Sequence, residues 1–312
     1  MASSMSRSLS TYCCTVTCFD ADGQIDDAAM RAHFGRIADA GVGLYVGSPS
    51  PGEGTTLTPP ELVHLLALAV ETAGGRVPVR AMGVEPRHTG EMKAFVALAA
   101  ATKVDAVQIY SLDIGHAVKP AAEELETYFR DVLDSCPLPA VLSSHAFVGY
   151  VVPVDMIERL AGDYKNLIGV NISTPDTLYL SEAISRLTPR LEIHVGGPMH
   201  TVTALALGGN GYLSTESNIA PRLCQEAIDH FRAGRVEQAF ESYGAIMALM
   251  RAVNTMPTAS VRRVKAAMRI VGMAGTGLRK PFAPLREEEL IGLRSELAEV
   301  ARRYSRPELI KR

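Results

Sequence analysis

The sequence predicts an α/β protein of the (β/α)8 TIM barrel class with a C-terminal helical extension. From residue 11 to about residue 215, eight short apolar segments alternate with amphipathic helical patterns. Continuous apolar strands followed by helices are typical of a parallel sheet whose outer face is covered. After residue 220 only helical patterns remain. An open, doubly wound sheet is the alternative, but no Gly-x-Gly-x-x-Gly motif follows the first strand.

Each predicted strand is short, apolar and bounded by glycine, proline or polar residues. The strands are expected at 12–19, 42–47, 77–83, 105–111, 138–144, 166–173, 191–197 and 211–217. The helices between them are expected at 26–40, 59–72, 89–101, 121–135, 154–160, 176–187 and 199–207. The clearest helix start is Thr58-Pro59-Pro60-Glu61, where an N-cap threonine, a proline at the first helical position and a glutamate form a capping box.

Three parts of the chain are expected: a flexible lead-in at 1–10, the barrel at 11–220 and a helical block at 221–312. Helices in the block are predicted at 221–233, 236–253, 260–272 and 285–302. We expect the block to pack beside the barrel and to contribute to oligomer formation. In the segment "GMAGTGLRKPFAPL", Arg279 and Lys280 are interpreted as part of a solvated loop.

Composition excludes several classes of function. The formal charge of −3 and a pI near 6.3 give no basic footprint for nucleic acid. No apolar run reaches the ~18 residues of a membrane span, and "MASSMSRSLS" lacks the apolar core of a secretory signal. The five cysteines are expected to be buried apolar side chains in a reducing compartment. These features predict a cytoplasmic protein.

In a barrel of this class the active site lies at the C-terminal ends of the strands. Glu85 stands at such a tip, and His145 is the preferred acid/base because an imidazole titrates near neutrality. The proposed catalytic residues are Tyr110, Asp113, Ser143, His145 and Asn171. The proposed substrate-binding residues are Ser48, Ser50, Glu53, Ser144, Ser173, Gly197, His200, Thr215 and Glu216.

Several of these residues allow a second interpretation. Asn171 orients a ligand or only hydrogen-bonds neighbouring strand ends, and His145 is a base or a solvent-facing loop residue. The carboxylate of Glu53 binds a ligand or backbone N–H groups. A metal shell drawn from His145, His200, Asp113, Glu53 and Glu216 is the alternative to acid/base chemistry. No metal and no cofactor is expected.

Four segments in order along the chain carry a family resemblance: "GLYVGSPSPGEGTTLTPPE", "LPAVLSS", "NLIGVNIST" and "VGGPMHTVTALALGGNGYLSTESNIAP". Together with the terminal helices they resemble the dihydrodipicolinate synthase/N-acetylneuraminate lyase family. The resemblance implies a barrel with a helical extension and a homotetramer or homodimer. It also implies a Schiff base between a strand-six lysine and a 2-keto acid. Tyr110 falls near the position at which the family places a tyrosine from the neighbouring subunit.

The catalytic positions depart from that family. Its strand-six lysine falls on Asn171, its strand-five tyrosine on Ser143, and its carboxylate-binding arginine near Val148. A carboxamide cannot condense with a ketone, because its nitrogen lone pair is delocalised into the carbonyl.

The sequence therefore predicts a divergent lyase that acts on a small carbonyl or carboxylic acid by non-covalent acid/base catalysis. The reaction is left open between aldol or retro-aldol, hydration or dehydration, and ring chemistry. A catalytically inactive family member that binds a small metabolite or serves as a scaffold is the alternative.

Overall fold

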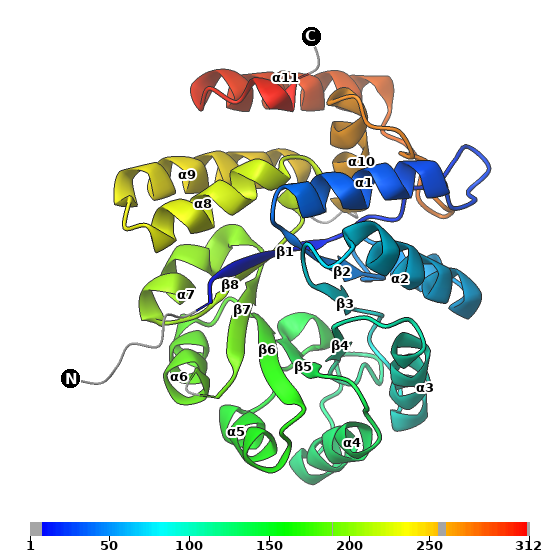
Figure 1. Cartoon of the computed structure of the whole chain (residues 1–312), viewed down its shortest axis with the longest axis vertical. Helices are drawn as coiled ribbons and strands as arrows, with labels where there is room; N and C mark the ends of the chain where they lie inside the picture. The colour runs from blue at the N-terminus through cyan, green and yellow to red at the C-terminus, as the bar shows by residue number, and fades with distance from the viewer. Residues whose placement is uncertain (1–7, 189, 255–259, 311–312) are drawn as a thin grey trace. The chain divides into compact units, whose positions relative to one another are not determined.

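The computed structural model describes residues 8–188, 190–254 and 260–310. Eight parallel strands form a closed barrel in sequence order, so the predicted fold class is confirmed (Figure 1). The strands are β1 (Ser10–Cys14), β2 (Gly43–Val46), β3 (Val79–Ala81), β4 (Ala106–Ile109), β5 (Ala140–His145), β6 (Leu167–Ser173), β7 (Glu192–Gly196) and β8 (Gly211–Ser214).

A helix follows every strand, and further helices extend the chain after the barrel. The helices of the barrel are α1 (Asp27–Asp39), α2 (Pro59–Ala73), α3 (Thr89–Ala100), α4 (Ala122–Asp134), α5 (Val154–Asp163), α6 (Thr177–Leu187), α7 (Thr201–Leu207) and α8 (Pro221–Arg232). The extension contains α9 (Val236–Val253), α10 (Ser260–Ile270) and α11 (Glu287–Arg303). Short 3-10 helices are η1 (Gly54–Thr56), η2 (Ala146–Val148), η3 (Pro198–His200), η4 (Glu216–Asn218) and η5 (Pro307–Leu309).

The first and last strands are shorter than predicted. The first strand was expected to run to residue 19, but β1 ends at Cys14, the last residue in register with β2. The apolar run continues beyond it because Val16 and Cys18 remain buried as loop residues and Phe19, also buried, forms only isolated bridges to Ile25 and Thr276. Burial without strand pairing produces the same sequence pattern as a strand, which explains the difference.

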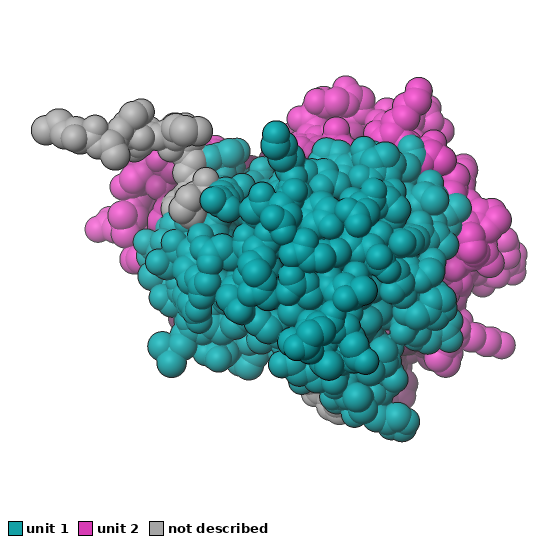
Figure 2. All heavy atoms as spheres, turned by 90° about the horizontal axis from the view of Figure 1, so that it is seen from below, with its two compact units in different colours: residues 1–11, 85–100, 106–213 teal, residues 12–84, 101–105, 214–312 magenta. Residues whose placement is uncertain are grey.

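The described chain forms two compact units, which Figure 2 shows in two colours. Unit 1 contains residues 1–11, 85–100 and 106–213, and unit 2 contains residues 12–84, 101–105 and 214–312. The predicted lead-in falls mostly on residues 1–7, which lie outside the described residues, and β1 already begins at Ser10. The division of barrel and helical block at residue 220 stays a prediction.

In unit 1, strands β4 to β7 form a sheet with helices on its outer side. Figure 1 places α4, α5 and α6 outside these strands. The outer face is identified by Ser144 of β5, whose hydroxyl lies 2.7 Å from the hydroxyl of Tyr179 on α6. Since side chains alternate between the two faces of a strand, Ser143 and His145 belong to the inner face.

Unit 2 is organised around the buried side chain of Asn218 in η4. Its Oδ1 accepts hydrogen bonds from the Val16 amide and from Nε2 of His33, each at 2.9 Å. Its Nδ2 donates to the carbonyl of Cys14 at 2.8 Å. One amide therefore joins the end of β1 to helix α1. All five cysteines are free and buried, as predicted. No helix in the described ranges is long and apolar enough to cross a membrane.

The neutral state of His33 should contribute to stability in a defined pH range. Burial lowers the pKa of His33 to about 3, whereas an unfolded histidine has a pKa of about 6.5. A lowered folded pKa stabilises the native state above pH ~6.5, and this stability is lost as the pH falls toward ~3. Between pH ~6 and ~4 His33 should steepen the pH dependence of the unfolding free energy by about 1.4 kcal/mol per pH unit.

Urea unfolding of the His33→Gln variant at several pH values measures this effect. Glutamine keeps a donor for Asn218 but cannot titrate, so the slope should be flatter than in the unmodified protein by one proton. The matched control is His64→Gln, which changes an exposed histidine that pairs with Asp27. An unchanged slope in His33→Gln would contradict the assignment.

Candidate functional site

The inner face of unit 1 gathers polar side chains from consecutive strands. Parallel pairing places Gln108 beside Val141, Ser143 beside Asn171, and Asn171 beside His194. Residues two apart on a strand share a face, so Tyr110 and His145 extend the same group toward the C-terminal ends of their strands. We call Gln108, Tyr110, Ser143, His145 and Asn171 the inner-face group. Each of its members is buried.

Asn171 occupies the middle of this group and is bound to Gln108. Its Nδ2 donates a hydrogen bond of 2.6 Å to Oε1 of Gln108 on β4. Removing one partner of a buried pair leaves a polar atom unsatisfied, which costs about 1–3 kcal/mol. The amide of Asn171 is thus held in one orientation, and Gln108 is a site residue that the sequence prediction missed.

His145, predicted to be the acid/base, is buried at the end of β5. Both of its ring nitrogens lack a hydrogen-bond partner among the described residues. The Tyr110 ring meets its imidazole edge-on, with ring centroids 5.4 Å apart and an interplanar angle of 88°. The neighbouring Phe147 ring is 5.7 Å away and 87% exposed. The imidazole is held by packing, and both of its nitrogens are buried.

A carboxylate accompanies this histidine. Nε2 of His145 lies 3.5 Å from Oε1 of Glu85, which follows β3 in sequence and belongs to unit 1. Burial lowers the pKa of His145 to about 4, opposed by the negative charge of Asp113. Burial also raises the pKa of the Glu85 carboxyl. At neutral pH the imidazole is therefore uncharged and able to accept a proton, and Glu85 stands next to the imidazolium that would form.

Hydrogen bonds fix the segment after β4. One joins it to β5, and two tyrosine hydroxyls donate to its backbone carbonyls. Ser111 Oγ donates to the Ser143 carbonyl at 2.9 Å, and the hydroxyl of Tyr128 donates to the Tyr110 carbonyl at 2.6 Å. The hydroxyl of Tyr150 donates to the Leu112 carbonyl at 2.8 Å. These contacts fix the backbone that carries Tyr110.

Ser144 and Asp113, also predicted, lie outside the inner-face group, whereas Ser173 shares its face. Ser144 faces outward, and its hydroxyl contacts the Tyr179 hydroxyl on α6 and accepts a hydrogen bond from the Val152 amide, which precedes α5. Asp113 is exposed and accepts a hydrogen bond from the Gly115 amide. Ser173 pairs with His145 in the β5–β6 register and so faces the same side as Asn171, and its hydroxyl lies so close to Gly196 that a side chain at residue 196 would collide with it.

Gly197 and His200 lie in the turn after β7. The Gly197 amide donates to the Leu213 carbonyl at 2.8 Å, and its φ of 76° favours glycine. His200 is half-buried at the end of η3. No contact brings either residue to the inner-face group, and their role in binding stays a prediction.

In unit 2, Glu53 is part of an ion pair rather than an available ligand group. Its carboxylate pairs with the ammonium of Lys265 on α10, and both side chains are 1% exposed. The Arg279 amide donates a further hydrogen bond of 3.2 Å to the same carboxylate. A buried charge needs a partner of opposite sign, and the partner of Glu53 lies 212 positions away along the chain. The assignment of Glu53 to substrate binding stays a prediction, and the structure shows its carboxylate engaged in this ion pair.

The interpretation of Arg279 as a solvated loop residue is wrong. Its guanidinium forms a two-point contact with the carboxylate of Glu61 and lies 4.3 Å from the centre of the Phe19 ring. The Lys265 ammonium lies 4.6 Å from the centre of the same ring. The loop before α11 is thus bound to the start of α2 by desolvated charges and an aromatic ring.

The remaining predicted residues of unit 2 serve its local structure. Ser48 Oγ accepts a hydrogen bond from the Gly52 amide, Ser50 is exposed, and the Thr215 carbonyl accepts one from Asn218. Glu216 is buried and accepts a hydrogen bond of 3.1 Å from Ser214 Oγ. Burial raises the pKa of its carboxyl to about 7.

Arg80 is a buried cation of unit 2 that the sequence prediction missed. It lies in the middle of β3, with its guanidinium 4.3 Å from the centre of the Tyr12 ring. The ring of Tyr45 on β2 is 5.9 Å from the same guanidinium. A guanidinium beside aromatic faces is stabilised by their negative quadrupole.

None of the eight strands contains a lysine. That Asn171 of β6 stands in place of the family's Schiff-base lysine stays a prediction. Within the described ranges, no three His, Cys, Asp or Glu side chains gather closely enough to hold a metal ion. A cavity of about 500 Å³ in unit 1, near Leu112 and Ile114, shares no lining residue with the inner-face group.

Comparison with known proteins gives consistent matches over nearly the whole chain. The family model described as the dihydrodipicolinate synthetase family matches residues 7–300. The 4-hydroxy-tetrahydrodipicolinate synthase of Methanococcus maripaludis is 27% identical over 279 residues, which cover 88% of this chain and 93% of that protein. A dihydrodipicolinate synthase from Bacillus anthracis is 28% identical, covers 92% of this chain and 96% of its own, and superposes with a TM-score of 0.83. A variant synthase described as monomeric shares the fold, with 24% identity, coverage of 96% and 99%, and a TM-score of 0.85.

Breaking the buried ion pair of unit 2 should be strongly destabilising. Lys265→Met leaves the Glu53 carboxylate buried without its cation, so the unfolding free energy should fall by about 3–5 kcal/mol. The double variant Lys265→Met/Glu53→Gln removes both charges and should recover part of this loss. Arg302→Met, which breaks an exposed pair with Glu299, should change stability by less than ~1 kcal/mol. Equal effects of the buried and exposed substitutions in urea unfolding would refute this account.

Proposed function

The chain belongs to the dihydrodipicolinate synthetase family, and from this premise we propose that it is a lyase that works without a Schiff base. Its proposed substrate is a small carbonyl or carboxylic acid, bound against the inner-face group of unit 1. The proposed chemistry is proton transfer next to a carbonyl, which underlies aldol cleavage and dehydration alike. The observation that carries the proposal is Asn171, an amide at the position where the family resemblance requires an amine.

The nucleophile is the first part of this argument. A Schiff base needs an amine with a free lone pair, and an amide nitrogen has none. The lysines of the described residues lie in helices and loops. Lys265 is the buried one, and its ammonium already pairs with Glu53 and donates to the Gly277 carbonyl at 2.5 Å. This supports a mechanism in which the substrate is held by hydrogen bonds and not by a covalent bond.

Proton transfer is assigned to His145 and Glu85. The neutral imidazole accepts a proton from the carbon next to the substrate carbonyl or from a substrate hydroxyl. The carboxylate 3.5 Å away then stabilises the imidazolium. Since both residues are largely shielded from water, the attraction between these charges is stronger than it would be in solvent. The imidazolium returns the proton to the leaving group or to carbon and becomes neutral again.

Substrate orientation is assigned to Asn171, Ser143 and Tyr110. Ser143 and Asn171 are direct neighbours across β5 and β6, so both approach the same ligand. The hydrogen bond to Gln108 fixes the amide before the substrate arrives, and preorganised donors stabilise a developing oxyanion without the cost of reorganisation. Assembly as a homotetramer or homodimer stays a prediction, because a monomeric variant with this fold exists.

Reductive trapping tests the absence of a Schiff base. The protein is incubated with pyruvate and sodium borohydride and its intact mass is measured. We expect no adduct, because no strand offers an amine to the keto acid. A family member that retains the strand-six lysine serves as the positive control. A pyruvate adduct on any lysine of this chain would restore the covalent mechanism.

Exchange of deuterium for the methyl protons of pyruvate tests the role of His145 without a known substrate. We expect the protein to catalyse this exchange in heavy water, as observed by proton NMR. His145→Asn should slow it by at least ~100-fold, the usual contribution of a general base. His64→Asn, an exposed histidine of α2, should leave the rate unchanged.

The pH profile of the same reaction follows from the environment of His145. The base form is lost only below the pKa of about 4, so the rate should stay level down to pH ~5 and fall below it. An acidic limb near pH 6.5, or an unchanged rate in His145→Asn, would contradict the assignment.

A further inference from the structure

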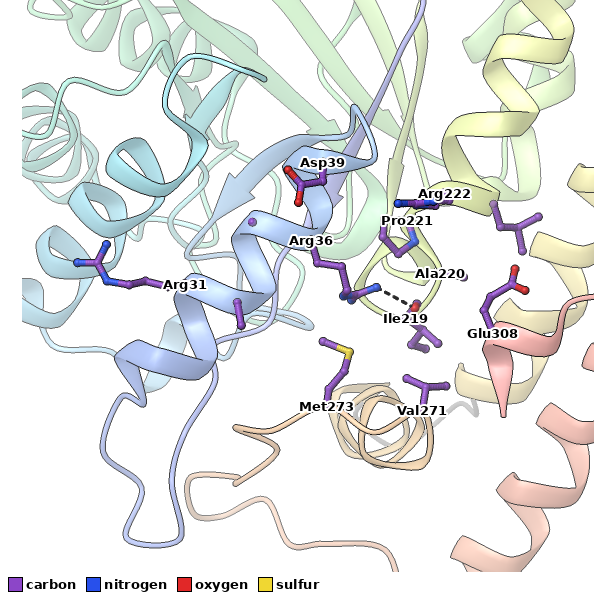
Figure 3. A pocket seen from close by; sticks show the side chains of 13 residues that line it. Arg31, Arg36, Asp39, Ile219, Ala220, Pro221, Arg222, Val271, Met273 and Glu308 are labelled. Carbon is purple, nitrogen blue, oxygen red and sulfur yellow. Dashed lines mark hydrogen bonds between the residues drawn. The ribbon is translucent and has the colours of Figure 1, made fainter. Parts of the chain in front are cut away.

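Unit 2 contains a cavity of about 580 Å³ that none of the predicted site residues lines. It lies between α1, the start of α8, the segment after α10 and η5 (Figure 3). Its volume falls within the range of small-molecule sites, about 300–1,000 Å³. Its apolar wall includes Ile219, Leu223, Val271 and Met273.

The charges around this cavity do not cancel. Of the charged residues at its wall, Arg31 pairs with Glu71 and Asp39 pairs with Arg76, while Glu308 lies 3.9 Å from Arg306, which it shares with Glu226 at 2.7 Å. Each of these pairs is completed by a residue outside the lining. Figure 3 shows Arg31 extending away from Arg36. Two guanidinium groups, those of Arg36 and Arg222, are left without an acidic partner.

Arg36 is the inner of these two cations. Its guanidinium donates to the carbonyls of Asn218 and Ile219, the latter at 3.0 Å, as the dashed line in Figure 3 marks. Its Nε is buried and has no hydrogen-bond partner among the described residues. Neutral carbonyls satisfy its donors in part but do not neutralise its charge.

Arg222 is the outer cation. It stands in the first turn of α8, is exposed, and forms no ion pair with any described residue. The partial positive charge of a helix start adds to that of the side chain. Two positive groups beside an apolar wall are complementary to a negative group that carries an apolar body.

We propose that this cavity binds a small monocarboxylate with an aliphatic chain. The carboxylate lies between the guanidinium groups of Arg36 and Arg222, where charge-assisted hydrogen bonds are strongest. The chain contacts Val271, Met273 and Ile219, where it displaces water from apolar surface. The site is separate from the inner-face group and independent of the proposed lyase activity.

Calorimetric titration of the full chain with hexanoate tests the proposal. Hexanamide, a neutral molecule of the same shape, is titrated in parallel. We expect hexanoate to bind with one site per chain and hexanamide to bind at least about tenfold more weakly, because it cannot form charge-assisted hydrogen bonds. Failure of the protein to bind hexanoate, or equal affinity for the two molecules, would overturn the proposal.

Three variants locate the site. Arg222→Gln should weaken hexanoate binding at least about fivefold, since one of the two cations is lost. Met273→Glu should abolish binding, because it places a negative charge on the apolar wall. Arg294→Gln removes an exposed arginine of α11 outside the cavity and should leave the affinity unchanged. Wild-type affinity in both cavity variants, or an equal loss in Arg294→Gln, would place the binding elsewhere and refute the site.

Arg36 is not substituted in this experiment, because it also holds the η4 segment. Its guanidinium contacts the Asn218 and Ile219 carbonyls, and one of its nitrogens lies 3.5 Å from Nδ1 of His33. A change at residue 36 would disturb those contacts together with the cavity. Arg222 and Met273 lack such links, so their effects report on the ligand.

Discussion

The candidate site depends on the period of two that parallel pairing imposes on each strand. In β4 to β7, one set of alternate side chains faces the covering helices and the other faces inward. Asn171 can meet Gln108, two strands away, because both belong to the inner set and the strands are held in one register. A shift by one residue would turn every member of the group to the other face. The polar character of the inner face is thus a consequence of register, and its chemistry follows from which residues occupy it.

An amide at the centre of that face limits the reactions that are open to the site. It can donate and accept hydrogen bonds but cannot form a covalent imine. His145 complements it as a group that can hold a proton, since burial keeps the ring neutral and Glu85 lies close to it. Neither residue is unusual alone. The proposed lyase activity combines binding by this amide with proton transfer by the neighbouring imidazole.

Much of the fold and part of the candidate site could be predicted from the sequence. The contacts that could not be predicted have identifiable physical reasons. The alternation of apolar strands and helices is local, so the barrel and the positions of Asn171 and His145 were predictable. The partner of Asn171 was not, because Gln108 looks like a polar interruption of an apolar strand until the barrel closes. The ion pairs of Glu53 and Arg279 were not predicted, because their partners, Lys265 and Glu61, lie more than 200 positions away. Burial of charge is a property of the folded chain and leaves little trace in a local pattern.

Unit 2 shows how charged residues far apart in the sequence are paired in the folded chain. Lys265 with Glu53, and Arg279 with Glu61, are charges that found partners, while Arg36 and Arg222 are charges that found none of opposite sign within the described residues. Asn218 is an intermediate case. Its side-chain amide joins β1 to α1 through neutral hydrogen bonds, and its backbone carbonyl accepts a hydrogen bond from Arg36. A crystal structure of the protein with bound pyruvate tests the function proposed for the inner face of unit 1 most directly. We expect an intact keto acid whose carbonyl oxygen lies within hydrogen-bond distance of the Asn171 side chain. Continuous electron density from a lysine Nζ to the second carbon of pyruvate would contradict the account.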